Sequence, residues 1–262
     1  MPIRSSYPNG IPAWIDIAST DAEAAKRFYG DLFGWQWIPE PLTDDETYWL
    51  GYLDGQPIVG LTGMTPGMVE SGMASRWFRY VAVDDVDATL AIAVLSGGTI
   101  MAPAMEVGTK GRMAFVRDPV GASIGLWHSD EIPGSGLILE PGVPVWQELH
   151  ALDLDAVGKF YGEVFDWTAT ATSRPDGSDV VMFAVGQEPV AGLATPSTAE
   201  VATDWHVYFY VDDVEATASA VLSNGGKVAA APEGDTGGVH AAFIDPTGAA
   251  FSVYSSPTEV GE

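Results

Sequence analysis

Cysteine is absent from the 262-residue sequence, which excludes disulfide bonds and thiolate metal sites. Long apolar runs are absent too, since none approaches the roughly 18 residues that a membrane-spanning helix needs. Basic residues are scarce, with 11 Lys and Arg against 36 Asp and Glu and a formal net charge of −25. This charge repels phosphate backbones and anionic lipid headgroups, so we expect neither nucleic acid nor membrane as a partner. The first residues lack the apolar stretch of a secretory signal, and we therefore expect a cytoplasmic protein.

Three blocks of the sequence occur twice and in the same order. KRFYGDLFGW (26–35) returns as GKFYGEVFDW (158–167), VAVDDVDAT (81–89) as FYVDDVEAT (209–217), and RDPVGASIGLW (117–127) as IDPTGAAFSVY (244–254). The copies lie 132, 128 and 127 residues apart, so one unit of domain size has been duplicated. We predict a first domain at residues 1–128, a Pro/Gly/Ser-rich linker at 129–142 and a second domain at 143–257. The hydrophobic content of 47% gives each domain enough apolar residues for a core.

Each half of the sequence shows the same alternation of strand and helix signals. An alternating run at 10–19 leads into a helix over 20–33, where the spacing of Thr20 and Glu23 predicts a capping box with Thr20 as the N-cap. The next two strand-like runs meet at Asp54-Gly55, a strong hairpin signal. The order then restarts at 76–83, so each domain is predicted to be βαβββ-βαβββ. The aromatic residues of the repeated decapeptide are predicted to lie in the core.

This order, with FYGDLFGW on the first helix and DPVG (118–121) or DPTG (245–248) before the last strand, resembles the vicinal oxygen chelate superfamily of glyoxalases, bleomycin-resistance proteins and extradiol dioxygenases. The PAWID segment (12–16) and VDDVDAT (83–89) look closest to a two-domain actinobacterial branch that includes proteins of anthracycline pathways. The resemblance implies an α+β fold of two tandem domains, each a pair of βαβββ modules forming an open barrel around a cavity.

Strand alternation predicts which side chains face each cavity, because successive residues of a strand point to opposite sides. The first cavity is expected to be lined by Trp14, Asp16, Phe78, Tyr80 and Trp127. The second is expected to be lined by Trp146, Glu148, His150, His206, Tyr208, Tyr210 and Tyr254. Aromatic walls with a few polar groups are typical of sites for planar small molecules. The alternative is that the aromatic side chains simply fill a collapsed barrel.

Metal binding is not predicted. In metal-binding members of the superfamily, His, Gln or Glu occupies four slots per domain, and alignment to this resemblance puts Trp14, Gly60, Phe78 and Gly125 in the first set. The second set is Trp146, Gly192, His206 and Ser252. Only His206 is a competent ligand, whereas a Zn²⁺ or Fe²⁺ site needs several converging donors. A displaced divalent metal site at Glu148, His150 and His206 remains as the alternative.

Three functions stay open on the sequence alone. The first is metal-independent tailoring of an aromatic, polyketide-like metabolite, with Glu148 as general base and His206 or a tyrosine as proton donor. The second is a drug-sequestering binding protein without catalysis, as the resistance branch implies. The third is a metal-dependent lyase, isomerase or dioxygenase, since the fold hosts all three classes. A monomer or a homodimer is expected.

Overall fold

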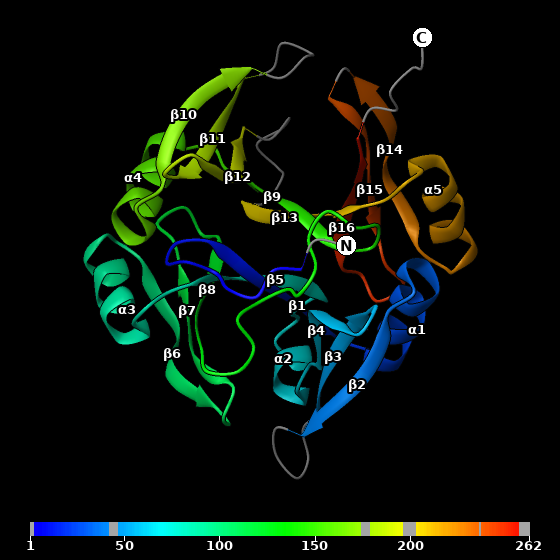
Figure 1. Cartoon of the computed structure of the whole chain (residues 1–262), viewed down its shortest axis with the longest axis horizontal. Coiled ribbons are helices and arrows are strands. Elements are labelled where there is room, and N and C mark those ends of the chain that lie inside the picture. Colours follow the sequence, from blue (N-terminus) through cyan, green and yellow to red (C-terminus); the bar gives the residue numbers. More distant parts are fainter. Residues whose placement is uncertain (1–2, 42–46, 174–178, 196–202, 236, 257–262) are drawn as a thin grey trace.

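The structure is a computed structural model of the chain that describes residues 3–41, 47–173, 179–195, 203–235 and 237–256 (Figure 1). The first domain contains β1 (Pro12–Ser19), α1 (Ala22–Phe33), β2 (Gln36–Pro41), β3 (Thr47–Leu53), β4 (Gln56–Gly63), α2 (Pro66–Glu70), β5 (Arg76–Ala82), α3 (Val86–Leu95), β6 (Thr99–Val107), β7 (Gly111–Arg117) and β8 (Ser123–Ser129). The second contains β9 (Pro144–His150), α4 (Leu154–Phe165), β10 (Thr168–Ser173), β11 (Asp179–Val185), β12 (Glu188–Ala194), β13 (Asp204–Tyr210), α5 (Val214–Ser223), β14 (Lys227–Asp235), β15 (Gly238–Ile244) and β16 (Ala250–Ser255).

Each domain is built on one eight-stranded sheet. The strand orders are β2-β3-β4-β1-β5-β8-β7-β6 and β10-β11-β12-β9-β13-β16-β15-β14, so the second sheet repeats the first. The two modules of a domain meet at an antiparallel pair, β1 with β5 or β9 with β13, and neither sheet closes into a complete barrel. The predicted fold class is therefore confirmed.

Local sequence explains how the helices begin and how the hairpin turns. The N-cap of α1 is Asp21, whose side chain accepts a hydrogen bond from the Ala24 backbone N–H; the prediction of Thr20 was wrong. An aspartate carboxylate satisfies this free N–H and also carries the negative charge that a helix N-terminus favours. The Asp54-Gly55 hairpin is confirmed, with φ angles of 49° and 77° at its two central residues.

The two hydrophobic cores are shared between the domains. One core packs α3 and its sheet against α4, and the other packs α1 against α5 (Figure 1). The aromatic residues of the decapeptides lie at their centres, since Phe28 and Phe160 are 2% and 1% exposed, which confirms their predicted core role. Burying each such ring contributes about 1.5–3 kcal/mol. Because each core contains a helix from both halves, neither half encloses a complete core alone.

Two matched hydrogen bonds join the repeated motifs across the domain boundary. The phenol of Tyr29, in the first decapeptide, donates to the carboxylate of Asp245 in the second DPxG turn at 3.1 Å. The phenol of Tyr161, in the second decapeptide, donates to Asp118 in the first DPxG turn at 3.0 Å. The motifs recur together because each helix contacts the turn of the other domain.

The segment between the sheets is packed rather than loose. Leu137 is 1% exposed in the core shared by α1 and α5, and the Gly142 carbonyl accepts a hydrogen bond from the Trp35 indole at 2.8 Å. An antiparallel bridge pairs Ile3 with Leu137. Within the described ranges, none of the helices is both long and apolar enough to cross a membrane.

Candidate functional site

The concave face of the first sheet holds one buried carboxyl group, that of Asp16 in β1. Its Oδ2 accepts hydrogen bonds from the phenols of Tyr80 at 2.7 Å and Tyr48 at 3.3 Å, and Tyr48 accepts one from the Trp14 indole at 2.8 Å. Burial raises the pKa of Asp16 to about 6, against the opposing effect of the two phenol donors. Burial also holds the pKa of both phenols well above the usual value, so they remain donors. The protein itself therefore supplies the partners that this carboxyl group needs.

Two glycines make room for these tyrosines. A methyl group at Gly60 would collide with the Tyr48 phenol oxygen, and one at Gly125 would collide with the Tyr80 ring. The strand register agrees, because it places Gly60 beside Asp16 and Gly125 beside Tyr80. The structure thus brings together Trp14, Asp16 and Tyr80 as predicted, in a hydrogen-bonded cluster that occupies the concave face.

Phe78 forms an aromatic wall with Phe115 next to this cluster, whereas Trp127 has its own contact with the connecting segment. Phe78 is half-buried and packs edge-on against Phe115, with ring centroids 5.3 Å apart. Phe115 also lies 5.0 Å from the Tyr80 ring, so it links the wall to the cluster. The indole of Trp127 donates to the Ile132 carbonyl at 3.0 Å, which fixes this ring toward the start of the connecting segment.

The concave face of the second sheet has a different polar centre. Glu148 is 4% exposed and takes the position equivalent to Asp16, and its Oε1 lies 2.8 Å from Nε2 of His150. With the carboxylate ionised, the imidazole N–H is the donor, and Nδ1 becomes the acceptor of the ring. The side chain of His150 is 24% exposed, so a ligand on this face can reach it. A carboxylate that orients an exposed imidazole is an arrangement suited to proton abstraction.

His206 packs against the His150 ring at a tilt, and its pKa is lowered. Its ring centroid lies 4.1 Å from that of His150, at an interplanar angle of 32°. Burial, with smaller contributions from the nearby His150 and Arg79, lowers the pKa of His206 to about 4. At neutral pH this imidazole carries no extra proton, which argues against the predicted role of His206 as proton donor. The structure instead brings His150 forward, which the sequence offered only as a possible metal ligand.

One substitution between the repeats explains why the two centres differ. Tyr48 pairs with Thr62, two residues after Gly60, and Val180 pairs with Ala194, two residues after Gly192. Tyr48 and Val180 therefore hold equivalent positions in the two repeats. Val180 has no hydroxyl group to offer, so no phenol covers Gly192, and the Glu148 carboxylate lies next to this glycine instead. The first centre is therefore bonded to phenols, whereas the second is bonded to an imidazole.

The predicted aromatic side chains lie on the same face of the sheet as the second centre. Tyr208, Tyr210 and Tyr254 are half-buried on adjacent strands, and Tyr210 and Tyr254 have ring centroids 6.4 Å apart. The phenol of Tyr254 donates to the Gly237 carbonyl at 2.7 Å, and that of Tyr210 lies 3.0 Å from the Ser256 hydroxyl. Trp146, on the same strand as Glu148, has its indole nitrogen close to Gly192. These rings offer flat apolar surfaces beside the imidazole pair.

The divalent metal that the resemblance implies does not fit the residues present. In the first domain the register places Asp16, rather than Trp14, beside Gly60, but this carboxyl group is bonded to phenols. In the second domain Glu148 and His150 are engaged with each other. Across the part of the chain that is described, no group of three or more His, Asp or Glu side chains is arranged to hold a metal ion.

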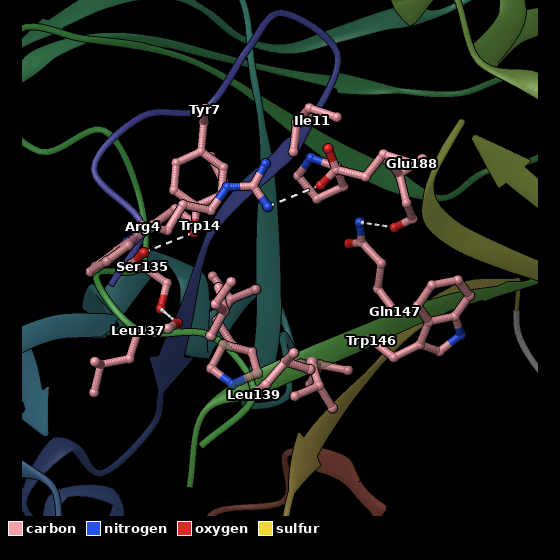
Figure 2. Close-up of a pocket in the computed structure, with 18 of the residues that line it drawn as sticks. Arg4, Tyr7, Ile11, Trp14, Ser135, Leu137, Leu139, Trp146, Gln147 and Glu188 are labelled. Atoms are coloured by element: carbon pink, nitrogen blue, oxygen red, sulfur yellow. Dashed lines mark hydrogen bonds and ion pairs between the residues drawn. The ribbon is translucent and has the colours of Figure 1, made fainter. Parts of the chain in front are cut away.

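A partly open pocket of about 280 Å³ lies where the first strands of the two domains meet, and we call it the inter-domain pocket (Figure 2). Its walls come from the N-terminal segment, the starts of β1, β9 and β12, and the segment between the sheets. Trp14 and Trp146 contribute to this pocket as well as to the concave faces. Figure 2 shows Arg4 reaching across the opening toward Glu188, with which it forms a 3.0 Å ion pair.

A buried arginine, Arg79, lies near the centre of the molecule, and its isolation was not predictable from the sequence. Arg79 is 2% exposed, and its guanidinium lies over the Trp205 ring at 5.1 Å. Its Nε and Nη2 have no hydrogen-bond partner among the residues that the structure describes. Burial lowers the pKa of Arg79 to about 10, which still leaves it charged at neutral pH. Val207 holds the equivalent position in the second domain, so this charge is a feature of one repeat only.

Comparison with known families assigns both halves to related domains. Residues 11–126 match the family described as Glyoxalase/Bleomycin resistance protein/Dioxygenase superfamily, and residues 147–254 match the family described as Glyoxalase-like domain. A Mycobacterium tuberculosis protein named "Putative glyoxylase CFP32" is 39% identical over 97% of both chains. The "Anthracycline biosynthesis protein DnrV" of Streptomyces peucetius is 32% identical over 94% of both chains.

Solved structures show the same fold at low sequence identity. A Mn(II)-bound glyoxalase from Novosphingobium aromaticivorans gives a TM-score of 0.65 at 16% identity, covering 94% of this chain and 82% of that one. The 2,3-dioxygenase LapB from Pseudomonas sp. KL28 gives a TM-score of 0.65 at 16% identity, covering 98% and 97%. At these identities the likeness concerns the fold alone.

Proposed function

Because the chain belongs to the glyoxalase/bleomycin resistance protein/dioxygenase superfamily, we propose that its second domain binds a planar aromatic metabolite and takes a proton from it. The observation that carries this proposal is the 2.8 Å contact between Glu148 and the partly exposed His150 on a tyrosine-lined face. Nδ1 of His150 receives the proton, and the carboxylate of Glu148 stabilises the imidazolium that forms. Neutral His206 stacks on the ring and holds its plane.

The chemical class of the ligand follows from the walls of this face. Tyr208, Tyr210, Tyr254 and Trp146 present aromatic surfaces, and an aromatic pair contributes ~0.5–1.5 kcal/mol beyond the burial of its area. A phenolic hydroxyl on a fused ring is acidic enough to lose its proton to an imidazole held by a carboxylate. The name of the Streptomyces relative refers to anthracycline biosynthesis, whose aromatic polyketides belong to this chemical class. The first domain, whose carboxyl group is already bonded to phenols, serves as a structural partner.

A hydroxyanthraquinone tests this proposal directly, because its visible absorbance moves to longer wavelength when its phenol ionises. We expect the bound probe to show the ionised band at neutral pH, with its phenol pKa lowered by on the order of one to two units. Glu148→Gln and His150→Asn should abolish the change in colour while the probe still binds. An ionised band that survives both substitutions would contradict the proposal.

The structure also offers a matched variant that rebuilds the first centre in the second. Val180→Tyr places a phenol where Tyr48 stands in the other repeat, within reach of Gly192 and the Glu148 carboxylate. The new phenol should compete with His150 for the carboxylate and therefore weaken the ionised band of the bound probe. An ionised band of unchanged strength in this variant would contradict the assignment of the base.

Binding without chemical change is the second candidate. It is favoured by the low pKa of His206, since this face then has a base without a charged acid beside it. Long incubation with the probe, followed by mass spectrometry of the recovered small molecule, separates the two. A product dependent on Glu148 supports a tailoring enzyme, and unchanged probe supports sequestration.

A further inference from the structure

The inter-domain pocket has the walls of a ligand site and shares Trp14 and Trp146 with the concave faces, but Glu148 and His150 do not line it. Its volume of about 280 Å³ lies near the lower end of the range for small-molecule pockets, ~300–1,000 Å³. Ile11, Leu137, Val145 and Val207 give it an apolar lining, and Tyr7 adds an aromatic ring. The phenol of Tyr7 donates to the Ser135 carbonyl at 2.8 Å, and this bond fixes the ring at the wall. Such a space accommodates a one- or two-ring molecule.

A buried amide provides the polar contact inside this lining. Gln147 is 6% exposed, and its Nε2 donates to the Val190 carbonyl at 3.3 Å. Figure 2 shows the amide reaching into the pocket, with its carbonyl oxygen on the side away from that hydrogen bond. The equivalent residue of the first domain is Ile15, which also lines the pocket and has no polar atom. An amide oxygen that faces an apolar pocket can accept a hydrogen bond from a ligand that carries a donor.

A strained residue at the same pocket gives independent support. Leu139 has a backbone φ of 57°, in the left-handed region that disfavours a branched side chain. Its side chain is nevertheless 68% exposed, so the strain is not offset by its own burial in the protein. Leu139 lines the pocket together with the neighbouring Leu137. An apolar ligand in the pocket would supply the contact that Leu139 lacks.

We propose that the inter-domain pocket binds a one- or two-ring aromatic molecule carrying a hydrogen-bond donor, which Gln147 accepts. Leu139 covers the ring, and the Arg4–Glu188 ion pair spans the opening above it. This site acts independently of the Glu148–His150 pair, because its walls come from the junction of the two domains.

Indole and N-methylindole form a matched pair of probes, since they share the ring system and only indole has an N–H donor. Titration calorimetry on the full chain should give one indole site per chain and about fivefold weaker binding of N-methylindole. Gln147→Leu should weaken indole about fivefold and leave N-methylindole unchanged, which removes the difference between the probes. Pro189→Trp, at an exposed position of the pocket wall, should lower the affinity for both probes more than tenfold.

Glu148→Gln locates the site, because it alters the concave face and leaves the pocket walls intact. Unchanged indole affinity in this variant supports the pocket, whereas loss of binding assigns indole to the concave face and overturns the proposal. No detectable indole binding to the unmodified chain also overturns it, as does equal affinity for the two probes. If Pro189→Trp does not fold, the response of the two probes to Gln147→Leu decides the question.

Discussion

Replacing Asp16 with asparagine should stabilise the protein at neutral pH and have little effect in acid. The folded chain raises the pKa of this carboxyl group from 3.8 to about 6, chiefly through burial. A carboxyl group with a raised folded pKa binds its proton more tightly when folded, so its stabilising contribution is complete below pH 3.8 and is lost as pH rises through about 6. A shift of this size corresponds to about 3 kcal/mol. Asparagine keeps an oxygen for the two phenols and carries no charge.

Urea unfolding over a series of pH values measures this difference. The free energy of unfolding of Asp16→Asn, minus that of the unmodified protein, should rise from near zero to about 3 kcal/mol as pH increases through the pKa of Asp16. His206 titrates in an overlapping range with the opposite sign, since its pKa falls from 6.5 to about 4 and its contribution is lost as pH decreases. Both proteins contain His206, so it cancels in the difference. Asp31→Asn, at an exposed position of α1, controls for the change in net charge. Parallel pH curves for Asp16→Asn and the unmodified protein would refute the reasoning.

Three further substitutions test the packing around the two centres. Gly60→Ala pushes a methyl group into the Tyr48 phenol oxygen, and chemical denaturation should show that the free energy of unfolding falls by about 2–4 kcal/mol. The control is Gly63→Ala, where the methyl group meets only ordinary van der Waals contact, and it should cost under about 1 kcal/mol. Tyr161→Phe removes the hydrogen-bond donor to Asp118 across the domain boundary and should lower the free energy of unfolding by about 1–3 kcal/mol. Because the cores are shared, calorimetry should still show a single unfolding transition, and two separate transitions would contradict this. Arg79→Met replaces an incompletely paired buried charge and should raise the melting temperature, and a fall would show that unseen partners stabilise the guanidinium.

The sequence was sufficient for the architecture because its signals were local and repeated. The decapeptides, the hairpin at Asp54-Gly55 and the DPxG turns each report a nearby backbone conformation, and duplication showed every signal twice. The N-cap of α1 was missed by one residue, since Thr20 and Asp21 are both good capping residues and only the helix geometry selects between them.

The candidate sites were less predictable because they depend on contacts between distant strands. Strand alternation correctly placed Trp14, Asp16 and Tyr80 on one face, yet it gave no sign that Tyr48 would reach Asp16 from another hairpin. The contact of His150 with Glu148 needed only the spacing of two along one strand, and this signal was available in the sequence. The pocket was not predictable, since its walls come from segments on both sides of the domain boundary.

The duplicated fold explains why the two centres could diverge without loss of stability. The shared cores hold both helices and DPxG turns in place, so matching residues such as Tyr29 and Tyr161 retain the same contacts. The concave faces lie on the other side of each sheet, where a change such as Tyr48 to Val180 alters the partner of a carboxylate and leaves the core unchanged. One repeat then bonds its carboxyl group internally, and the other presents it to an exposed imidazole. The two repeats therefore differ in the partner of this carboxyl group, while the contacts between the motifs of the shared cores are the same.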